Sequence, residues 1–221
     1  MIVAERKPIA EIMEMVGPRK KMLVVGCGAC VTVCMAGGER EAEILATTLE
    51  LAFRNEGKQF LWDCVERQCE TEFVEPLRDK VRASAGVLSM GCGVGVQTLA
   101  AVFPESAVFP ALNTHFMGRP VEQGLWAETC AGCGTCILSK TGGICPIARC
   151  SKSLLNGPCG GSVNGRCEVD PEHIECAWQL IYDRLEAWDA LDLMDEIMPP
   201  KDWSTSAHGG VRRVFREDVV L

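Results

Sequence analysis

Cysteine spacing constrains this chain more than any other feature. The 221-residue sequence contains 14 cysteines, with Cys27, Cys30 and Cys34 grouped near its start. A longer array follows, made of Cys130, Cys133, Cys136, Cys145, Cys150, Cys159 and Cys167. Thiolates are soft ligands that suit zinc and iron–sulfur clusters, and gaps of two residues let neighbouring thiolates bind one metal centre. The spacing therefore predicts a protein that carries metal centres.

A disulfide framework is the competing explanation for so many cysteines. Such frameworks belong mainly to short secreted chains, whereas this sequence begins MIVAERKPIAEIMEM, without the apolar segment of a secretory signal. It also contains no apolar run long enough for a transmembrane helix. A net charge of −8 argues against nucleic acid as a partner, because phosphate binding requires a basic surface. We expect a cytoplasmic protein with reduced thiols, no membrane insertion and no nucleic-acid partner.

The first half of the chain alternates between strand and helix patterns. The apolar run MLVVG is typical of a buried parallel strand, and the amphipathic segment 40–57 ends at a glycine as helices often do. Further strands are expected at 59–63, 86–91 and 107–112. This alternation predicts an α/β fold, with a small parallel Rossmann-like sheet domain over residues 1–115.

The second half is irregular and then helical. Residues 116–170 are dominated by Gly, Pro and Cys, so we expect a cysteine-rich metal-binding region of loops held by its ligands. Asp170-Pro171 is typical of a helix start, which predicts a C-terminal helix reaching about Met194. Its expected apolar stripe consists of Ile174, Trp178, Ile181, Leu185 and Trp188.

A basic tail ends the chain. Residues 171–221 are expected to form the C-terminal helix and a partner-docking tail. The tail carries Arg212, Arg213 and Arg216 on an otherwise acidic protein, which suggests a docking surface, with a frayed terminus as the alternative.

The first candidate site lies where the strands of the parallel sheet end. Cys27, Cys30 and Cys34 follow the first strand, and open α/β domains bind ligands at this carboxyl edge. Since one [4Fe-4S] cluster needs four thiolates, we favour these three with Cys92 or Cys69. Cys64 is the least favoured member. The rival is a nucleotide site formed by GCGAC, GCGVG and Asp63, although neither turn completes the phosphate-binding pattern.

The second candidate site begins with the C-x2-C-x2-C run of Cys130, Cys133 and Cys136. Cys145-Pro146 resembles the end of the bacterial ferredoxin signature, but eight residues rather than three precede it, so no ferredoxin fold is expected. The further thiols of Cys150, Cys159, Cys167 and Cys176 would suffice for two cubane clusters, or for one cluster with a zinc. The position of Cys176 is equally consistent with a role as a metal ligand and with a role as a buried small residue.

No catalytic constellation emerges from the sequence. His115, His173 and His208 have no evident nucleophile or base partner, and ordinary surface or buried roles explain them. Whether the chain is itself an enzyme stays open at this point. Clusters without residues that handle a substrate favour an electron relay.

Several longer strings resemble the MetV family. They are VGCGACVTVCMAGGEREAEILA, VERQCE, SMGCGVGVQTLA, CAGCGTCILSKTGGICPIARCSKSLLNGPCGGSVNGRCEVD and HGGVRRV. MetV is the small cysteine-rich subunit of bacterial methylenetetrahydrofolate reductase. By this resemblance Cys64 is an extra, and the family's cysteines correspond to Cys27, Cys30, Cys34, Cys69, Cys92 and the run from Cys130 to Cys167.

The resemblance implies a role in one-carbon metabolism, in the methyl branch of acetogenesis. MetV partners MetF, a TIM-barrel flavoprotein that holds FMN and the folate. This chain would relay electrons from an electron-donor protein through two or more [4Fe-4S] clusters to that flavin. Two alternatives stay open: a structural or assembly subunit that holds zinc without a redox role, and a nucleotide-dependent oxidoreductase.

Overall fold

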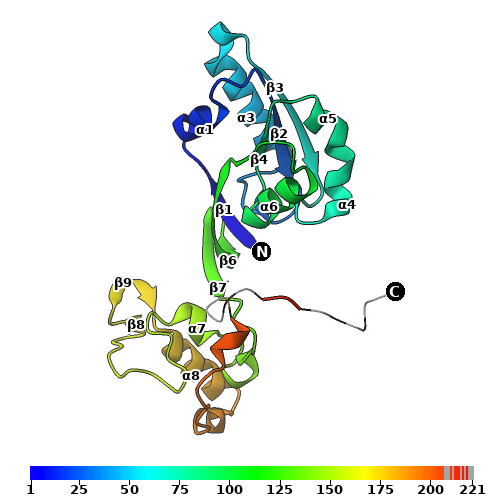
Figure 1. The fold of residues 1–221 in the computed structure, drawn as a ribbon. Coiled ribbons are helices and arrows are strands. Elements are labelled where there is room, and N and C mark those ends of the chain that lie inside the picture. Colours follow the sequence, from blue (N-terminus) through cyan, green and yellow to red (C-terminus); the bar gives the residue numbers. More distant parts are fainter. Residues whose placement is uncertain (207–209, 211, 215, 217, 219–221) are drawn as a thin grey trace. The chain divides into compact units, whose positions relative to one another are not determined.

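The computed structural model describes residues 1–206, 210, 212–214, 216 and 218 (Figure 1). The chain divides into two compact units, Met1–Trp126 and Ala127–Leu221. This division lies later than the boundary expected after residue 115. None of the helices in the described ranges has the length and apolar character needed to cross a membrane.

A four-stranded parallel sheet organises the first unit, as the sequence predicts. The strands lie in the order β3-β2-β4-β5, so that β2 is central. Residues 22–27 of β2 are all buried, which explains the uninterrupted apolar run in the sequence. The strands are β2 (Lys21–Cys27), β3 (Gln59–Val65), β4 (Val87–Ser89) and β5 (Val108–Pro110).

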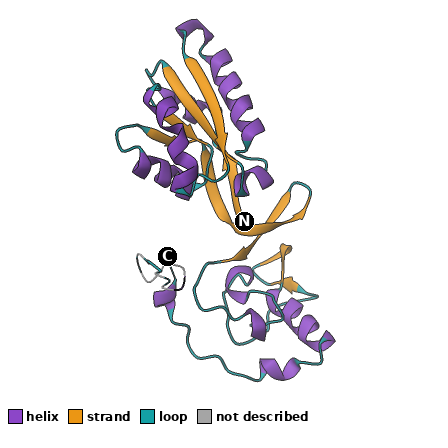
Figure 2. Ribbon diagram, turned by 90° about the vertical axis from the view of Figure 1, so that its right-hand side faces the viewer, coloured by secondary structure: helices purple, strands orange, loops and turns teal. Residues whose placement is uncertain are grey.

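Helices cover both faces of this sheet (Figure 2). Met22 and Val24 pack in one apolar cluster with residues of α1 and α3, whereas Leu23 and Val25 pack in a second cluster with residues of α4, α5 and α6. This division follows from the alternation of side chains along a strand. The helices are α1 (Ile9–Val16), α2 (Cys30–Val33), α3 (Glu39–Ala52), η1 (Arg54–Glu56), α4 (Thr71–Val74), η2 (Glu75–Leu77), α5 (Arg78–Arg82) and α6 (Gly93–Val102).

A second sheet was not predicted from the sequence. Its strands are β1 (Ile2–Arg6), β6 (Leu112–Glu122) and β7 (Leu125–Cys130), in the order β1-β6-β7, and β1 pairs antiparallel with β6. The expectation of loops from residue 116 onward is therefore wrong for residues 116–122 and 125–130, which belong to β6 and β7. Most residues of β6 are exposed, so its sequence lacks the apolar pattern that identifies a buried strand.

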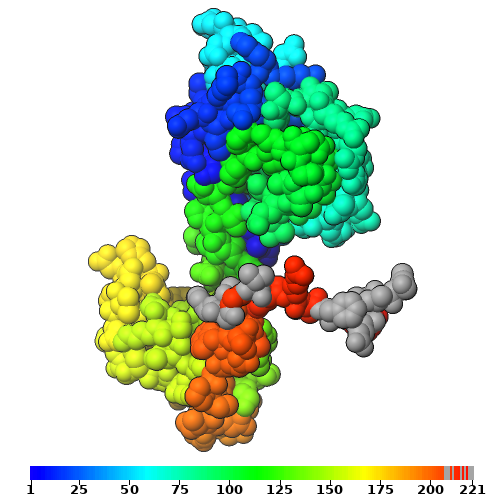
Figure 3. Space-filling model, in the orientation of Figure 1, coloured from blue at the N-terminus to red at the C-terminus, as the bar shows by residue number. Residues whose placement is uncertain are grey.

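The second unit contains short elements around a small core. Ile144, Trp178, Ile181 and Leu185 form this core. The hairpin of β8 and β9 stands out from the rest of the unit in the space-filling view (yellow in Figure 3). The elements are η3 (Leu138–Lys140), α7 (Pro146–Arg149), β8 (Arg166–Cys167), β9 (Asp170–Glu175), α8 (Ala177–Ala187), η4 (Leu191–Met194) and η5 (Trp203–Thr205).

The C-terminal helix begins at Ala177, later than predicted. Asp170 Oδ1 accepts hydrogen bonds from the backbone N–H groups of Glu172 (3.2 Å) and His173 (3.0 Å), as a helix cap would. The chain nevertheless continues as a strand, because β9 pairs with β8. Trp178, Ile181 and Leu185 are buried as predicted. The other two members of the expected stripe lie elsewhere: Ile174 belongs to β9 and Trp188 is 56% exposed.

Candidate metal centres

Cysteines gather at the carboxyl edge of the parallel sheet. Cys27 is the last residue of β2, and Cys30 is the first residue of α2. On the neighbouring strand, Cys64 lies opposite Gly26 in the β2–β3 register. Cys69 lies in the turn before α4, and Cys92 is the N-cap of α6. The loops that follow three strands therefore carry these thiols to one edge, as expected for a parallel sheet.

Cys34 has a different environment. Its side chain is buried in the first apolar cluster, and its thiol lies 3.7 Å from the carbonyl oxygen of Ala4 and 3.6 Å from that of Val31. A buried small residue with a weak S–H donor commonly behaves in this way. Cys34 therefore has a packing role in the structure in addition to its place in the predicted ligand set.

Electrostatic effects show which thiols at this edge are neighbours. Burial, followed by the charge of Cys27, raises the pKa of Cys64 to about 11. The pKa of Cys69 is also raised, first by burial and then by the charges of Cys27 and Cys92. Cys27 and Cys92 are thus both within electrostatic reach of Cys69. A bound cation would favour the thiolate forms of Cys64 and Cys69, whose pKa values are raised in the metal-free site.

A buried glutamine that sequence reasoning missed holds this edge together. Gln68 Nε2 donates hydrogen bonds to the carbonyl oxygens of Val25 (2.8 Å) and Gly26 (3.0 Å). Gln68 Oε1 accepts one from Ser89 Oγ (2.6 Å). Both side chains are fully buried. The only hint in the sequence is that Gln68 directly precedes the candidate ligand Cys69. Sequence alone does not distinguish such a glutamine from one on the surface.

The residues weighed for a nucleotide site have partners within the protein. Asp63 forms an ion pair with Lys80, with 2.6 Å between Nζ and Oδ2. The backbone N–H of Gly93, at the start of α6, donates to Thr114 Oγ1 at 2.9 Å.

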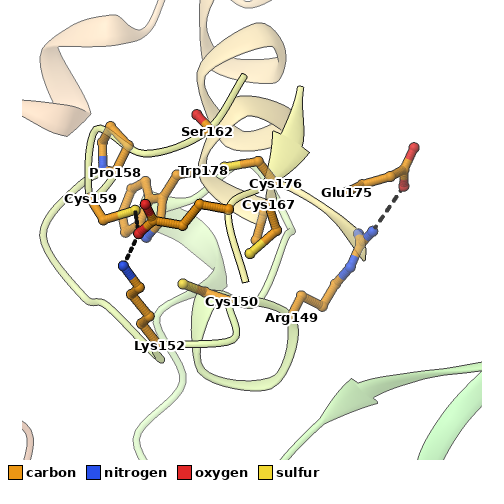
Figure 4. Close-up of a pocket in the computed structure, with 12 residues that line it drawn as sticks. Arg149, Cys150, Lys152, Pro158, Cys159, Ser162, Cys167, Glu175, Cys176 and Trp178 are labelled. Carbon is orange, nitrogen blue, oxygen red and sulfur yellow. Dashed lines mark hydrogen bonds and ion pairs between the residues drawn. The ribbon is translucent and has the colours of Figure 1, made fainter. Parts of the chain in front are cut away.

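Four cysteines of the second unit line one pocket (Figure 4). Cys150 follows α7, Cys159 lies in a loop, Cys167 ends β8, and Cys176 is the N-cap of α8. The free volume of the pocket is about 20 Å³, enough for a single ion or water molecule. Sequence reasoning treated Cys176 as ambiguous, and the structure places it with three predicted ligands.

Charged side chains also line this pocket. Lys152 forms an ion pair with Glu168, and the Cys159 thiol donates to Glu168 Oε1 at 3.3 Å. The Lys152 hydrogen bond holds the pKa of Glu168 below its usual value. A hydrogen bond with Ser151 is the main cause of the lowered pKa of Cys167. These contacts favour ionised groups around the thiols.

The remaining cysteines of the second array lie outside this pocket. Cys130 ends β7, and its sulfur accepts a hydrogen bond from the backbone N–H of Gly132 at 3.4 Å. Cys145 is the N-cap of α7. Cys136 lines a separate cavity of about 340 Å³. Cys130, Cys133, Cys136 and Cys145 therefore do not line the pocket that Cys150, Cys159, Cys167 and Cys176 share.

The donor chemistry of both sets fits a soft metal. All 14 cysteines are free thiols and lie in the described part of the chain. Among the described residues, no three His, Cys, Asp or Glu side chains already stand in a metal-binding arrangement. Binding of a metal would therefore have to draw the thiols together, which is common where metal binding is coupled to folding.

Comparison with known proteins gives one match. Residues 109–204 match the sequence model of the family described as "Methylene-tetrahydrofolate reductase C terminal". This segment is related to methylenetetrahydrofolate reductase. The reductase-related segment contains the second cysteine array and Cys176, whereas Cys27, Cys30, Cys34, Cys69 and Cys92 precede it. No curated protein and no solved structure matches the chain.

Proposed function

We propose that this chain is a MetV-type electron-transfer subunit of a methylenetetrahydrofolate reductase complex. The observation that carries the proposal is the match of residues 109–204 to the reductase family, because the matched segment contains every cysteine of the second array. The strings resembling MetV extend beyond that segment to both sides. Catalysis on the folate would then belong to a MetF-type flavoprotein partner.

The candidate ligands form two sites, one in each unit of the chain. Cys27, Cys69 and Cys92, with Cys30 in place of the buried Cys34, would hold one [4Fe-4S] cluster at the sheet edge, and the second unit would hold at least one more. Such clusters, when bound, supply one-electron transfer. The buried apolar faces beneath β2 would keep water from one side of the first site. An electron-donor protein and a partner flavin would lie at the two ends of the relay.

Metal analysis of the anaerobically purified full chain tests the proposal. We expect enough iron and acid-labile sulfide for at least two clusters, with electron paramagnetic resonance (EPR) signals from the dithionite-reduced protein. The matched control is the same preparation after chelation and removal of its metal. Stoichiometric zinc with only trace iron, after reconstitution with iron and sulfide, would contradict the relay.

A zinc-holding assembly subunit is the second candidate. The observation in its favour is that four thiols, those of Cys150, Cys159, Cys167 and Cys176, line one small pocket. A four-thiolate zinc site would staple the loops of the second unit without redox chemistry. Stoichiometric zinc with only trace iron in wild type, and loss of that zinc in Cys159→Ser, would support this candidate.

A further inference from the structure

A buried polar network crosses the carboxyl edge of the parallel sheet, where Figure 1 shows β2 and β4 side by side. Gln68 is its centre: its amide donates to the carbonyl oxygens of Val25 and Gly26, at the end of β2. Its oxygen accepts from Ser89, at the end of β4. The Ser89 hydroxyl in turn accepts from the backbone N–H of Gly91 at 3.2 Å. The network therefore joins three separate segments of the chain.

Each of those segments continues directly into a cysteine. Cys27 follows Gly26, Cys69 follows Gln68, and Cys92 follows Gly91. The network thus fixes the backbone one residue before each of three candidate ligands. Since adjacent residues are joined by a rigid peptide unit, fixing the first strongly restricts the position of the second.

The glycines beside Gln68 show how closely the network is packed. A Cβ at Gly91 would lie 2.5 Å from Gln68 Oε1, and a Cβ at Gly95 would lie 2.7 Å from Gln68 Cβ. Both distances are too short for a side chain, so these glycines leave the space that the glutamine occupies. An apolar residue could fill this space without hydrogen bonds. A fully bonded amide instead specifies one arrangement of the three segments.

We propose that Gln68 is a positioning residue, which sets Cys27, Cys69 and Cys92 for joint binding of the iron–sulfur cluster at this edge. This inference rests on the function proposed above. Gln68 would not itself bind iron: its two amide protons and its oxygen are engaged with Val25, Gly26 and Ser89.

The test compares full-length Gln68→Met with two other variants. Methionine keeps the unbranched length of glutamine and removes its hydrogen bonds. Gln97→Met is the matched control, because Gln97 is exposed on α6 and donates only to Gly93 within its own helix. Cys27→Ser identifies which EPR component belongs to the sheet-edge cluster.

Two measurements are made on each protein. After anaerobic reconstitution with ferrous iron and sulfide, Gln68→Met should lose or shift the EPR component that Cys27→Ser loses, while the other signals and Gln97→Met match wild type. In the metal-free protein, amide hydrogen exchange over residues 65–70 and 89–93 should be roughly tenfold faster in Gln68→Met, since buried hydrogen bonds are lost. The far-UV circular dichroism spectrum should not change.

The outcomes separate this inference from the proposed function. Wild-type EPR and wild-type exchange rates in Gln68→Met would overturn the inference and leave the relay intact. If the wild-type chain takes up no iron, the proposed relay function is contradicted. Unchanged hydrogen exchange in metal-free Gln68→Met would then contradict the positioning role of Gln68 as well. If Gln68→Met fails to fold, Ser89→Ala replaces it. That change removes the bond to Gln68 Oε1 and the bond accepted from the Gly91 N–H but keeps both amide bonds of Gln68, so it should give a smaller change of the same kind.

Discussion

Two cysteines illustrate how far the protein environment changes a thiol. Cys64 is partly buried beside Cys27, Asp63, Glu39 and Glu41, and its pKa is raised to about 11. Cys167 accepts hydrogen bonds that stabilise its thiolate, and its pKa is lowered. Because the thiolate is the nucleophile, the two cysteines should react at very different rates.

We predict that iodoacetamide labels Cys167 well before Cys64 in the metal-free protein at pH 8. At that pH a thiol with a pKa of about 11 is ionised in only about one molecule in a thousand. Peptide mapping by mass spectrometry at timed intervals measures both rates, and the urea-unfolded protein, in which the rates should converge, is the control. Equal rates in the folded protein would contradict these assignments.

The raised pKa of Cys64 also has a consequence for stability. An acid whose pKa is higher in the folded state stays protonated there while the unfolded chain ionises. The stabilisation from Cys64 is therefore complete below pH 9.0, the pKa of an ordinary thiol here, and is lost as the pH rises toward about 11. Cys64→Ala should flatten that alkaline decline in a urea-unfolding series.

At the scale of elements, the C-terminal tail contacts the loop of the C-x2-C-x2-C run. Lys201 Nζ donates to the carbonyl oxygen of Thr135 at 2.8 Å, and Thr205 Oγ1 donates to that of Cys133 at 3.0 Å. Arg212 donates to the carbonyl oxygen of Gly132 at 3.1 Å. The tail thus satisfies backbone carbonyl groups between the candidate ligands, a role that sequence reasoning did not foresee.

Docking of a partner by the basic tail stays a prediction. Arg216 pairs with Asp218 within the tail. His208, Gly209 and Val211 of the HGGVRRV string lie outside the described residues.

We predict that Thr205→Val loosens the loop over residues 130–136. Valine has the shape of threonine but lacks the hydroxyl donor, so one hydrogen bond to the loop is lost, worth about 1 kcal/mol or roughly a fivefold change in opening. Hydrogen exchange over the loop should rise by that factor. Thr48→Val is the control, because Thr48 donates only to Ile44 within α3. Unchanged loop exchange would show that the Thr205 bond does not hold the loop.

At the scale of the whole molecule, the two units have unequal apolar cores. In the first unit, two buried clusters lie on opposite faces of the parallel sheet. The second unit has one small cluster built around Trp178, Ile181 and Leu185. Such a core supplies little stabilisation for a segment of this length, so metal ligation should supply much of its order.

We predict that replacing a cysteine by serine has different effects in the two units. Cys27→Ser should lose a cluster while its sheet stays resistant to protease, because the apolar clusters do not depend on the metal. Cys159→Ser should make residues 130–167 sensitive to protease. Limited trypsin digestion of both variants, with Ser162→Ala as a control at the same pocket, gives the comparison. Equal resistance of the two cysteine variants would mean that the second unit folds without its metal.

Local sequence patterns predicted the elements whose buried residues form a regular pattern along the chain. The parallel strands were predictable because β2 is apolar from Met22 to Val25, and because β2 and β4 both run into glycine-rich turns. The sheet of β1, β6 and β7 was not, because pairing with a distant segment stabilises a strand as polar as β6. The start of α8 was misplaced, because the turn at Asp170 uses the same hydrogen bonds in a hairpin as at a helix start.

The sequence by itself determined the donor chemistry: many thiols, closely spaced, at the ends of parallel strands and in a segment short of apolar residues. Those properties depend on residue type and local spacing. Only the tertiary structure decided that Cys176 joins Cys150, Cys159 and Cys167 at one pocket and that Gln68 joins the sheet edge. Such groupings depend on contacts between segments far apart in the chain, and local spacing does not encode them.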